Sequence, residues 1–355
     1  MIKAKCASKN WIEAITKSTK AKDTILVEKV IKALMLLEGL AKSDLNFVFK
    51  GGTALMLLFK SNRRLSIDID IITPDKYVVL DSILEKICKE YGFIRFKSEE
   101  RNAKTQIDKM HYKLFFESAI EKKESYVLLD ILKEEIQYQN VIEAPIESVF
   151  VELDATPISV RIPDFNDILG DKLTAFAPNT TGIPYKKGSK EMGMEIIKQM
   201  YDIGSLFDHA NNVEIISAVF SSFANTELQY RRKACSISDV LDDIIENSLE
   251  ICLRGNYGKA NFEVLSKGIL QVKGFIYSES FHLDKAIVYA AKVAYVAGLI
   301  KYKKKEIKKF DVKKTQEMKD WLIKEPISTK LNKLKKSNAE AFFYLYQLSE
   351  LISDE

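Results

Sequence analysis

The sequence predicts an α+β protein in which a mixed αβ half, residues 1–163, precedes a helical half, residues 164–355. Up to about Pro163, short apolar runs with the alternating pattern of strands recur between helix-like segments. Beyond Pro163, apolar residues recur almost throughout at the three- and four-residue spacing of helices. No internal repeat and no low-complexity linker separates the halves, so the change of pattern alone defines the boundary.

The front half alternates helices and strands. A first helix is expected after Asp23 or Thr24, either of which can serve as its N-cap. A second is expected after Thr73, with Thr73 as N-cap and Pro74 as the first helical residue. The expected strands cover residues 46–50, 66–71, 93–96, 110–116, 126–132 and 149–152, and a short helix covers residues 53–60.

The back half reads as a series of helices. Asp164 begins one, a loop rich in Gly, Pro and Asn covers residues 178–193, and the next helix runs through Tyr201. Within the loop, Tyr185 and its neighbouring lysines can form a stacking platform for an acceptor base, or they can belong to a solvated connector. The residues leave both interpretations open.

The composition is that of an ordinary water-soluble protein, with 46% hydrophobic residues, 29% charged residues and a formal net charge of +4. Four scattered cysteines without C-x-x-C spacing and only three histidines argue against a zinc centre. The start of the chain lacks the apolar core of a targeting segment, and the most apolar helix, about residues 282–300, carries charges. We therefore expect a cytoplasmic protein with reduced thiols and no membrane partner.

Asp68 and Asp70 form the most informative pair of residues. On a strand they project from one face, while Ile67, Ile69 and Ile71 project from the other and anchor the strand in the core. Two carboxylates so close raise each other's pKa unless a cation lies between them. A hard divalent cation with oxygen ligands, Mg²⁺ above all when phosphates complete its shell, meets this need.

The turn Gly51-Gly52 supplies a second component of the same site. Between a strand and a helix, glycines let the backbone approach a ligand closely, and the helix start offers N–H donors to phosphate. The hydroxyl of Thr53 can add another donor. A triphosphate between this turn and a metal ion on Asp68 and Asp70 would have its charge matched from both sides.

Asp130 is the candidate third carboxylate. It stands in an otherwise apolar strand-like run, where an ionised group is costly unless it is paired or metal-bound. Three carboxylates can hold two Mg²⁺ ions, one on the triphosphate and one that activates the attacking hydroxyl. A Gly-Gly turn, an Asp-x-Asp pair or a strand-edge Asp is often structural by itself, but their combination in this order favours catalysis.

These residues carry a resemblance to a known family. The order Gly51-Gly52-Thr53-Ala54-Leu55, followed by Arg64 and the Asp68-Ile69-Asp70-Ile71 run, resembles the AbiEii/AbiGii-type nucleotidyltransferase toxins. That family belongs to the DNA polymerase β-like nucleotidyltransferase superfamily. The resemblance continues through residues 170–176 and 197–203. It implies a polymerase β-like domain, a mixed sheet with flanking helices, followed by a helical domain that completes the active-site cleft.

The resemblance also assigns roles to individual residues. It implies that Asp68, Asp70 and Asp130 are metal ligands, and that Gly51, Gly52, Thr53 and Arg64 contact the nucleotide. It implies that Lys172 contacts nucleotide phosphate or ribose, and that Asp202 supports the site or assists proton transfer. The chain departs from many relatives at Lys198-Gln199, where they have Arg-Asp, and this puts any role for a downstream arginine in doubt.

The function implied by the resemblance is Mg²⁺-dependent transfer of NMP from an NTP to an RNA acceptor, with the tRNA 3′ end as the first candidate. Such an enzyme would act as the toxin of a toxin–antitoxin or abortive phage infection system and would have a cognate antitoxin protein. The alternatives are NMP transfer to a protein hydroxyl and a catalytically silent nucleotide-binding module. A lysine-rich segment, residues 301–310, can steer RNA electrostatically or can simply be a solvated face.

Overall fold

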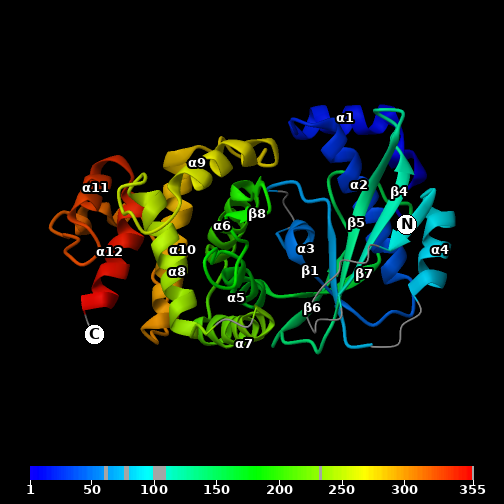
Figure 1. Cartoon of the computed structure of the whole chain (residues 1–355). Coiled ribbons are helices and arrows are strands. Elements are labelled where there is room, and N and C mark those ends of the chain that lie inside the picture. The colour runs from blue at the N-terminus through cyan, green and yellow to red at the C-terminus, as the bar shows by residue number, and fades with distance from the viewer. Residues whose placement is uncertain (60–62, 76–79, 99–108, 232–233, 354–355) are drawn as a thin grey trace. The chain divides into compact units, whose positions relative to one another are not determined.

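The computed structural model describes residues 1–59, 63–75, 80–98, 109–231 and 234–353. The chain divides into two compact units, coloured along the chain in Figure 1. The first comprises Met1–Asp164 together with Gly274–Ser280, and the second comprises Phe165–Lys273 and Phe281–Glu355. The first unit is mixed αβ and the second is almost wholly helical.

The first unit is built on a five-stranded sheet. Its strand order is β1-β2-β5-β4-β3, in which β2 and β5 run parallel and every other neighbouring pair is antiparallel. A two-stranded sheet, β6-β7, accompanies it. The strands are β1 (Val48–Lys50), β2 (Ile69–Thr73), β3 (Arg95–Ser98), β4 (Lys109–Glu117), β5 (Glu124–Lys133), β6 (Val141–Pro145) and β7 (Ser159–Pro163).

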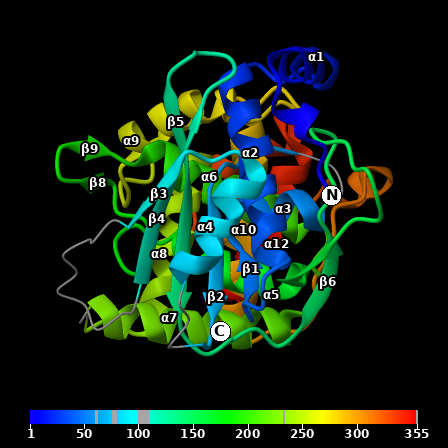
Figure 2. The ribbon, with the colours of Figure 1, turned by 90° about the vertical axis from the view of Figure 1, so that its right-hand side faces the viewer.

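Helices α2 and α4 lie over one face of the five-stranded sheet (Figure 2). Asp23 caps α2 through its carboxylate, which accepts hydrogen bonds from the amides of Ile25 (2.8 Å) and Leu26 (3.1 Å), as predicted. Most strand residues that alternate toward this face are buried, among them Ile71, Leu114 and Leu129. The helices of the unit are η1 (Ala4–Ala7), α1 (Lys9–Thr19), α2 (Thr24–Ala41), α3 (Gly51–Leu58) and α4 (Leu80–Tyr91).

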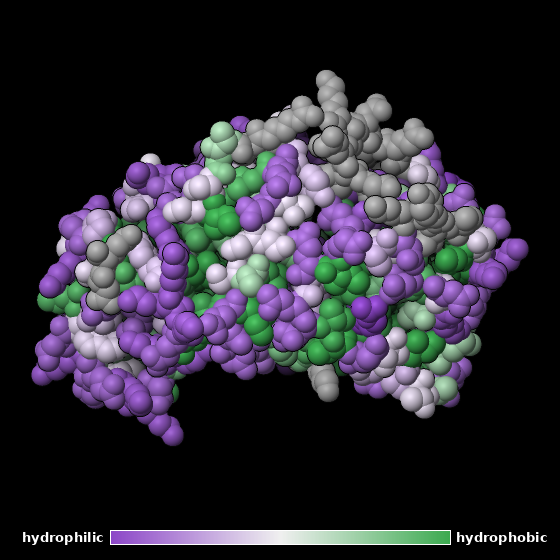
Figure 3. All heavy atoms as spheres, turned by 90° about the horizontal axis from the view of Figure 1, so that it is seen from below, coloured by the Kyte–Doolittle hydropathy of each residue, from purple (hydrophilic) through white to green (hydrophobic). Residues whose placement is uncertain are grey.

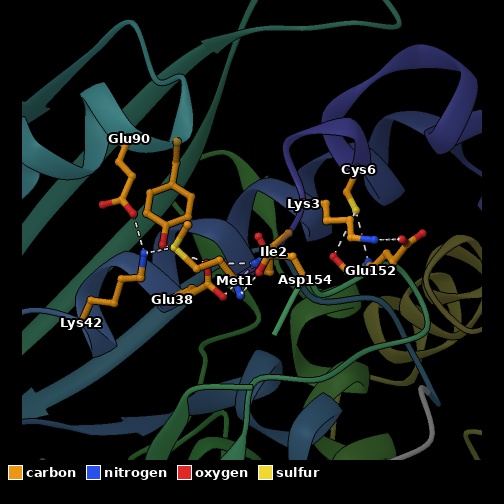
Figure 4. Close-up of polar contacts among 10 residues, drawn as sticks. Met1, Ile2, Lys3, Cys6, Glu38, Lys42, Glu90, Glu152 and Asp154 are labelled. Carbon is orange, nitrogen blue, oxygen red and sulfur yellow. Dashed lines mark hydrogen bonds and ion pairs between the residues drawn. The ribbon is translucent and has the colours of Figure 1, made fainter. Parts of the chain in front are cut away.

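The first residues of the chain lie against α2 (Figure 4). The Ile2 amide donates to both carboxylate oxygens of Glu38, at 3.0 and 3.1 Å, and the Tyr91 hydroxyl donates to the same carboxylate at 2.9 Å. Lys3 pairs with Glu152. A buried glutamate on α2 thus holds the end of α4 and the start of the chain together.

Two local predictions for this unit are wrong. Residues 149–152 are not a strand; the Val151 amide bonds to the Ser148 carbonyl in a turn, and the strands of this region are β6 and β7 instead. Thr73 does not cap a helix, because it ends β2, donates to the Asn46 carbonyl (2.8 Å) and accepts from the Asp75 amide. Residues 76–79, where that helix was expected to continue, lie outside the described residues.

Gly274–Ser280 returns from the helical part of the chain to the first unit, a feature that the sequence did not predict. We call this segment the strap. Ile276 forms a β-bridge with Arg64, and the Leu65 amide donates to the Phe275 carbonyl at 2.9 Å. The Ser278 hydroxyl donates to the carbonyl of Arg63. The strap therefore fixes the backbone just ahead of Asp68.

The second unit packs around α10. This helix contacts α6, α8 and α12, and it is buried along nearly its whole length. Its Lys292 is neutralised by Asp208 (2.7 Å) and Glu340 (2.9 Å). The helices are α5 (Phe165–Ala175), α6 (Gly193–Phe207), α7 (Val213–Arg231), α8 (Ile237–Cys252), α9 (Phe262–Gln271), η2 (Val272–Gly274), α10 (Leu283–Lys301), η3 (Val312–Met318), η4 (Thr329–Lys333), α11 (Leu334–Ser337) and α12 (Ala339–Ser353). A short hairpin, β8 (Lys186–Lys187) and β9 (Lys190–Glu191), precedes α6.

Hydrophilic side chains cover most of the face shown in Figure 3, with hydrophobic residues visible between them. Among the helices of the described chain, none combines the length and the apolar character that crossing a bilayer requires.

Candidate active site

Asp70 and Asp130 lie side by side at the centre of the five-stranded sheet. They are direct partners in the register of the parallel strands β2 and β5, so their backbones are about 4.8 Å apart. Their neighbours Ile69, Ile71 and Ile131 are at most 1% exposed and hold both strands in the core. The alternation that buries these isoleucines places the two carboxylates together on the opposite face.

The backbone of Gly51 lies directly against the Asp70 carboxylate. Gly51 has a φ of +79°, and a Cβ atom built on it would lie 2.1 Å from Asp70 Oδ2. A Cβ on Gly52 would lie 2.6 Å from Arg64 Nη2 and 2.7 Å from Ser66 Oγ. The helix α3 begins at Gly51 itself, so the two glycines form its first turn and bring the helix N-terminus next to an aspartate.

Asp68 lies just before β2, which begins at Ile69 and not at residue 66 as predicted. Its carbonyl accepts a 2.6 Å hydrogen bond from the Thr53 hydroxyl, and Thr53 is fully buried. In this structure the Thr53 hydroxyl therefore positions the Asp68 backbone, whereas the sequence predicts that it donates to a ligand. The segment before β2 is held by hydrogen bonds, to α3 through the Thr53 hydroxyl and to the strap through the Leu65 amide.

Arg64 is 7% exposed and lies beneath the Gly51-Gly52 turn. Its guanidinium donates to the Leu65 carbonyl at 3.1 Å, and its backbone is bridged to Ile276 of the strap. The structure thus gives Arg64 a clear part in supporting the turn that carries the glycines.

A pocket of about 350 Å³ opens beside the two carboxylates. His111 of β4 is the register partner of Asp130, and its Nδ1 lies 2.6 Å from Asp130 Oδ1. The Asp130 side chain is 35% exposed and that of His111 13%. The pocket is lined by Lys50, Asp70, Ile71, Lys109, His111, Asp130, Ile131 and Leu132. Two aspartates and two lysines around one pocket can bind an anion and a cation together.

The donor chemistry of this site suits a hard divalent cation. Adjacent carboxylates on two strands, one of them pressed against a glycine backbone, are the ligand type that Mg²⁺ prefers. Among the described residues, no three acidic, histidine or cysteine side chains already converge as a complete metal cluster. Phosphate oxygens of a nucleotide are the donors that complete a Mg²⁺ shell in such sites.

Lys172 and Asp202 belong to the second unit, where they pair with each other. Lys172 Nζ on α5 lies 2.9 Å from Asp202 Oδ2 on α6 and donates to Gln199 Oε1 at 3.0 Å. Their side chains are 8% and 2% exposed. Gln199, one of the two residues that depart from the family pattern, thus helps to hold this lysine.

The sequence was compared with models of protein families and the structure with solved structures. The family described as the nucleotidyl transferase AbiEii toxin of type IV toxin–antitoxin systems matches residues 35–261, well over half of the chain. The chain belongs to this family.

The structural comparison agrees with the family match. The fold of this AbiEii-family protein aligns with that of MenT4, a nucleotidyltransferase toxin from Mycobacterium tuberculosis, with a TM-score of 0.52 and 11% identity over 95% of this chain and 98% of that one. JHP933 from Helicobacter pylori aligns with a TM-score of 0.43 and 16% identity over 80% of this chain and 94% of that one. A search of curated protein sequences found no match. The polymerase β-like fold and the nucleotidyltransferase activity predicted from the sequence are thereby confirmed.

The loop before α6 in this AbiEii-family chain is held in place by α8. Asp243 accepts from the amides of Asn179 (2.8 Å) and Thr180 (3.0 Å), and burial raises the pKa of its carboxyl. The Tyr185 hydroxyl donates to Asn247, and burial raises its pKa to about 12. These contacts favour the connector interpretation of the loop over a stacking platform formed by Tyr185.

Three lysines of the lysine-rich segment, residues 301–310, make side-chain contacts within the second unit. Lys301 pairs with Asp242, and Lys305 pairs with Glu214 at 2.5 Å. Lys309 donates to the Phe207 carbonyl and lies 3.7 Å from the centroid of that ring, and burial lowers its pKa to about 8. At these three positions the positive charge contacts neighbouring helices.

Sequence reasoning missed three residues of the pocket, Lys50, Lys109 and His111. Lys50 adjoins the Gly-Gly turn and could have been found from that position. His111 and Lys109 lie within or next to a predicted strand, but only the register of β4 on β5 brings them to Asp130.

Proposed function

We propose that this toxin nucleotidyltransferase moves NMP from an NTP to the 3′ hydroxyl of an RNA, with tRNA as the first acceptor to test. The hydroxyl oxygen attacks the α-phosphorus, the bond to pyrophosphate breaks, and the hydroxyl proton is released. The observation that carries the proposal is the side-by-side placement of Asp70 and Asp130 against the backbone of Gly51. That arrangement offers a triphosphate a helix N-terminus on one side and carboxylates for a cation on the other.

Asp68, Asp70 and Asp130 would hold the Mg²⁺. When bound, Mg²⁺ neutralises the triphosphate and makes the attacking hydroxyl more acidic. Lys50 and Lys109 line the same pocket and add positive charge for the phosphates. We further propose that Lys172 contacts the nucleotide and that Asp202, its partner at 2.9 Å, keeps it in position.

The membership of a type IV toxin family supports two further points. Modification of tRNA would block translation and thereby arrest growth. A cognate antitoxin protein would inhibit this activity. Loss of that inhibition during infection would give the toxin a role in phage defence. Expression of the chain alone should stop growth, and co-expression of its cognate antitoxin should restore it.

The test is incubation of the purified protein with total tRNA, Mg²⁺ and each radiolabelled NTP in turn. Label should enter RNA with one or more NTPs, and Asp68→Ala/Asp70→Ala should reduce incorporation by about 100-fold or more. Chelation of the metal should abolish it, and added Mg²⁺ should restore it. A thermal melt of the double variant checks that it is folded.

Each remaining outcome contradicts the proposal in a different way. Label on protein in place of RNA would establish a protein hydroxyl as the acceptor. Tight binding of Mg²⁺·NTP without transfer to either would show a catalytically silent module. Equal incorporation by the double variant would mean that the activity belongs to a contaminant or to another site.

A further inference from the structure

The sheet face that carries Asp130 and His111 continues into a row of aromatic and basic side chains. Phe115 on β4 is the register partner of Tyr126 on β5 and also of Arg95 on β3, so the three residues lie side by side across three strands. Lys113 lies between His111 and Phe115 on β4. Because side chains two residues apart share a face, all of these project to the same side of the sheet. We call Arg95, Lys113, Phe115 and Tyr126 the sheet strip.

The side chains of the sheet strip touch one another. The Phe115 and Tyr126 ring centroids are 5.8 Å apart, and the Arg95 guanidinium lies 3.7 Å from the Phe115 centroid. Lys113 Nζ lies 4.8 Å from the Tyr126 ring, and Lys29 lies 5.1 Å from it. The strip is thus a continuous surface of rings and cations.

The sheet strip is outside the hydrophobic core. Tyr126 is 37% exposed, whereas Leu114, Phe116 and Val127, which point to the opposite face, are at most 1% exposed. Cross-strand aromatic pairs stabilise sheets by themselves, but that role needs no surrounding lysines. Arg95 pairs with Glu124 at 2.7 Å, and the same face also carries lysines, including the exposed Lys97 and Lys109.

An exposed tyrosine and a half-buried phenylalanine next to cations have the chemistry of a single-stranded nucleic-acid surface. Bases stack on aromatic faces, and lysine and arginine hold the phosphates. We propose that the sheet strip binds the unpaired 3′ end of the RNA acceptor and directs it to Asp130. Tyr126 is four residues before Asp130 on β5, about 13 Å along the strand, a distance that a few unpaired nucleotides can span.

The inference rests on the proposed function, because it concerns the acceptor of the same reaction. It adds that the acceptor is recognised as a single strand, through stacking and charge and not through the edges of particular bases. A blunt RNA duplex has no free bases to stack and should bind the strip poorly.

The test measures binding directly, by fluorescence anisotropy, with two labelled RNA hairpins that differ only in a four-nucleotide unpaired 3′ end. The wild-type protein should prefer the hairpin with the overhang. Tyr126→Ala should weaken overhang binding by about tenfold, and Tyr126→Phe, which keeps the ring, should bind normally. Lys113→Gln should weaken binding and reduce the slope of log affinity against log salt by about one.

Matched controls separate the strip from general charge and folding effects. Lys313→Gln removes an exposed lysine of the second unit and should leave overhang binding unchanged. Melting curves of the Tyr126 variants show whether a loss of binding is a loss of fold, and Lys113→Gln still tests the strip if Tyr126→Ala does not fold.

Two results would overturn the inference. One is unchanged overhang affinity in both Tyr126→Ala and Lys113→Gln while transfer to tRNA persists; the proposed function would then stand and the acceptor would bind elsewhere. The other is the absence of RNA binding together with NMP transfer to a protein, where Tyr126→Ala abolishes that transfer. The strip would then bind a protein acceptor. Overhang binding that depends on the strip without any transfer would support the strip and contradict the proposed function.

Discussion

Gly51 is the residue on which the candidate site depends most directly for its shape. Replacement by alanine imposes a side chain on a φ of +79° and places a methyl group 2.1 Å from the Asp70 carboxylate. We expect Gly51→Ala to lower the free energy of unfolding by about 1–3 kcal/mol and to abolish NMP transfer, because Asp70 has to move. Urea unfolding and the labelled transfer assay measure the two effects.

Gly188 provides the matched control. It has a φ of +60°, but nothing lies within 4 Å of its added Cβ. Gly188→Ala should therefore lower the free energy of unfolding by about 1 kcal/mol, from backbone strain alone, and should retain transfer activity. Equal loss of activity in the two variants would show that backbone strain, and not the contact with Asp70, is responsible.

The sequence predicts those parts of the candidate site whose signal is local. The Gly-Gly turn and the alternation around Asp70 are each contained in a few consecutive residues, so turn chemistry and strand periodicity predict them. The apolar surroundings of Asp130 marked it as unusual. His111 could not be predicted, because its position depends on the pairing of β4 with β5, and register between strands is set by the whole sheet.

Lys172 and Asp202 allow a structural role to be separated from a catalytic one. Asp202→Ala leaves a buried cation without its partner and should destabilise the second unit by about 3–5 kcal/mol. Lys172→Met/Asp202→Leu removes both charges and should recover most of that stability. If Lys172 contacts the nucleotide, the double variant should melt normally and still transfer no NMP.

The exposed pair of Glu263 and Lys267 is the comparison for this experiment. Their atoms are 2.8 Å apart on the surface of α9, where solvent screens the charges, so Glu263→Ala should leave the melting curve unchanged. Normal transfer by Lys172→Met/Asp202→Leu would show that the pair serves the fold alone.

At the scale of elements, Lys32 links α2 to the end of α4. It is 6% exposed and donates to the carbonyls of Tyr91 (3.2 Å) and Gly92 (3.5 Å). Burial lowers its pKa from the ordinary 10.5, although the nearby Glu28 acts in the opposite direction. Between the lowered pKa and 10.5 the unfolded chain holds the proton that the folded chain has lost, so the free energy of unfolding rises with pH in that window.

Lys32→Met removes this titration. The stability of the wild type relative to Lys32→Met should therefore increase as the pH rises from 7 toward 10.5, as urea unfolding at several pH values would measure. Parallel pH profiles for the two proteins would mean that Lys32 keeps its ordinary pKa in the folded state.

The elements that were predicted wrongly are those that distant contacts decide. Thr73 followed by Pro74 has the sequence of a helix start, but its hydroxyl bonds to Asn46 at the far side of β1. Residues 149–152 have the apolar pattern of a strand, yet Glu152 is engaged by Lys3 and Lys5 and the backbone turns instead. Tertiary hydrogen bonds at these positions override the local propensity for helix or strand.

At the scale of the whole molecule, the strap is a segment of the first unit that lies, in sequence, between two parts of the second unit. It leaves the helical unit after Lys273, crosses to the segment before Asp68 and returns at Phe281. A boundary drawn from composition cannot reveal it, because a seven-residue return carries no periodic signal. The first unit is therefore incomplete as residues 1–164 alone.

Ile276 tests this dependence, since it is 1% exposed and its backbone pairs with that of Arg64. Ile276→Ala should leave a cavity in the first unit and lower its free energy of unfolding by about 2–5 kcal/mol. NTP binding should weaken with it, because the chain leading to Asp68 and Asp70 loses support. Leu270→Ala, at a 63% exposed position on α9, removes a similar side chain close by in sequence and should change neither property. If Ile276→Ala melts like Leu270→Ala and binds NTP normally, the strap is a passive connection and the αβ unit is stable without it.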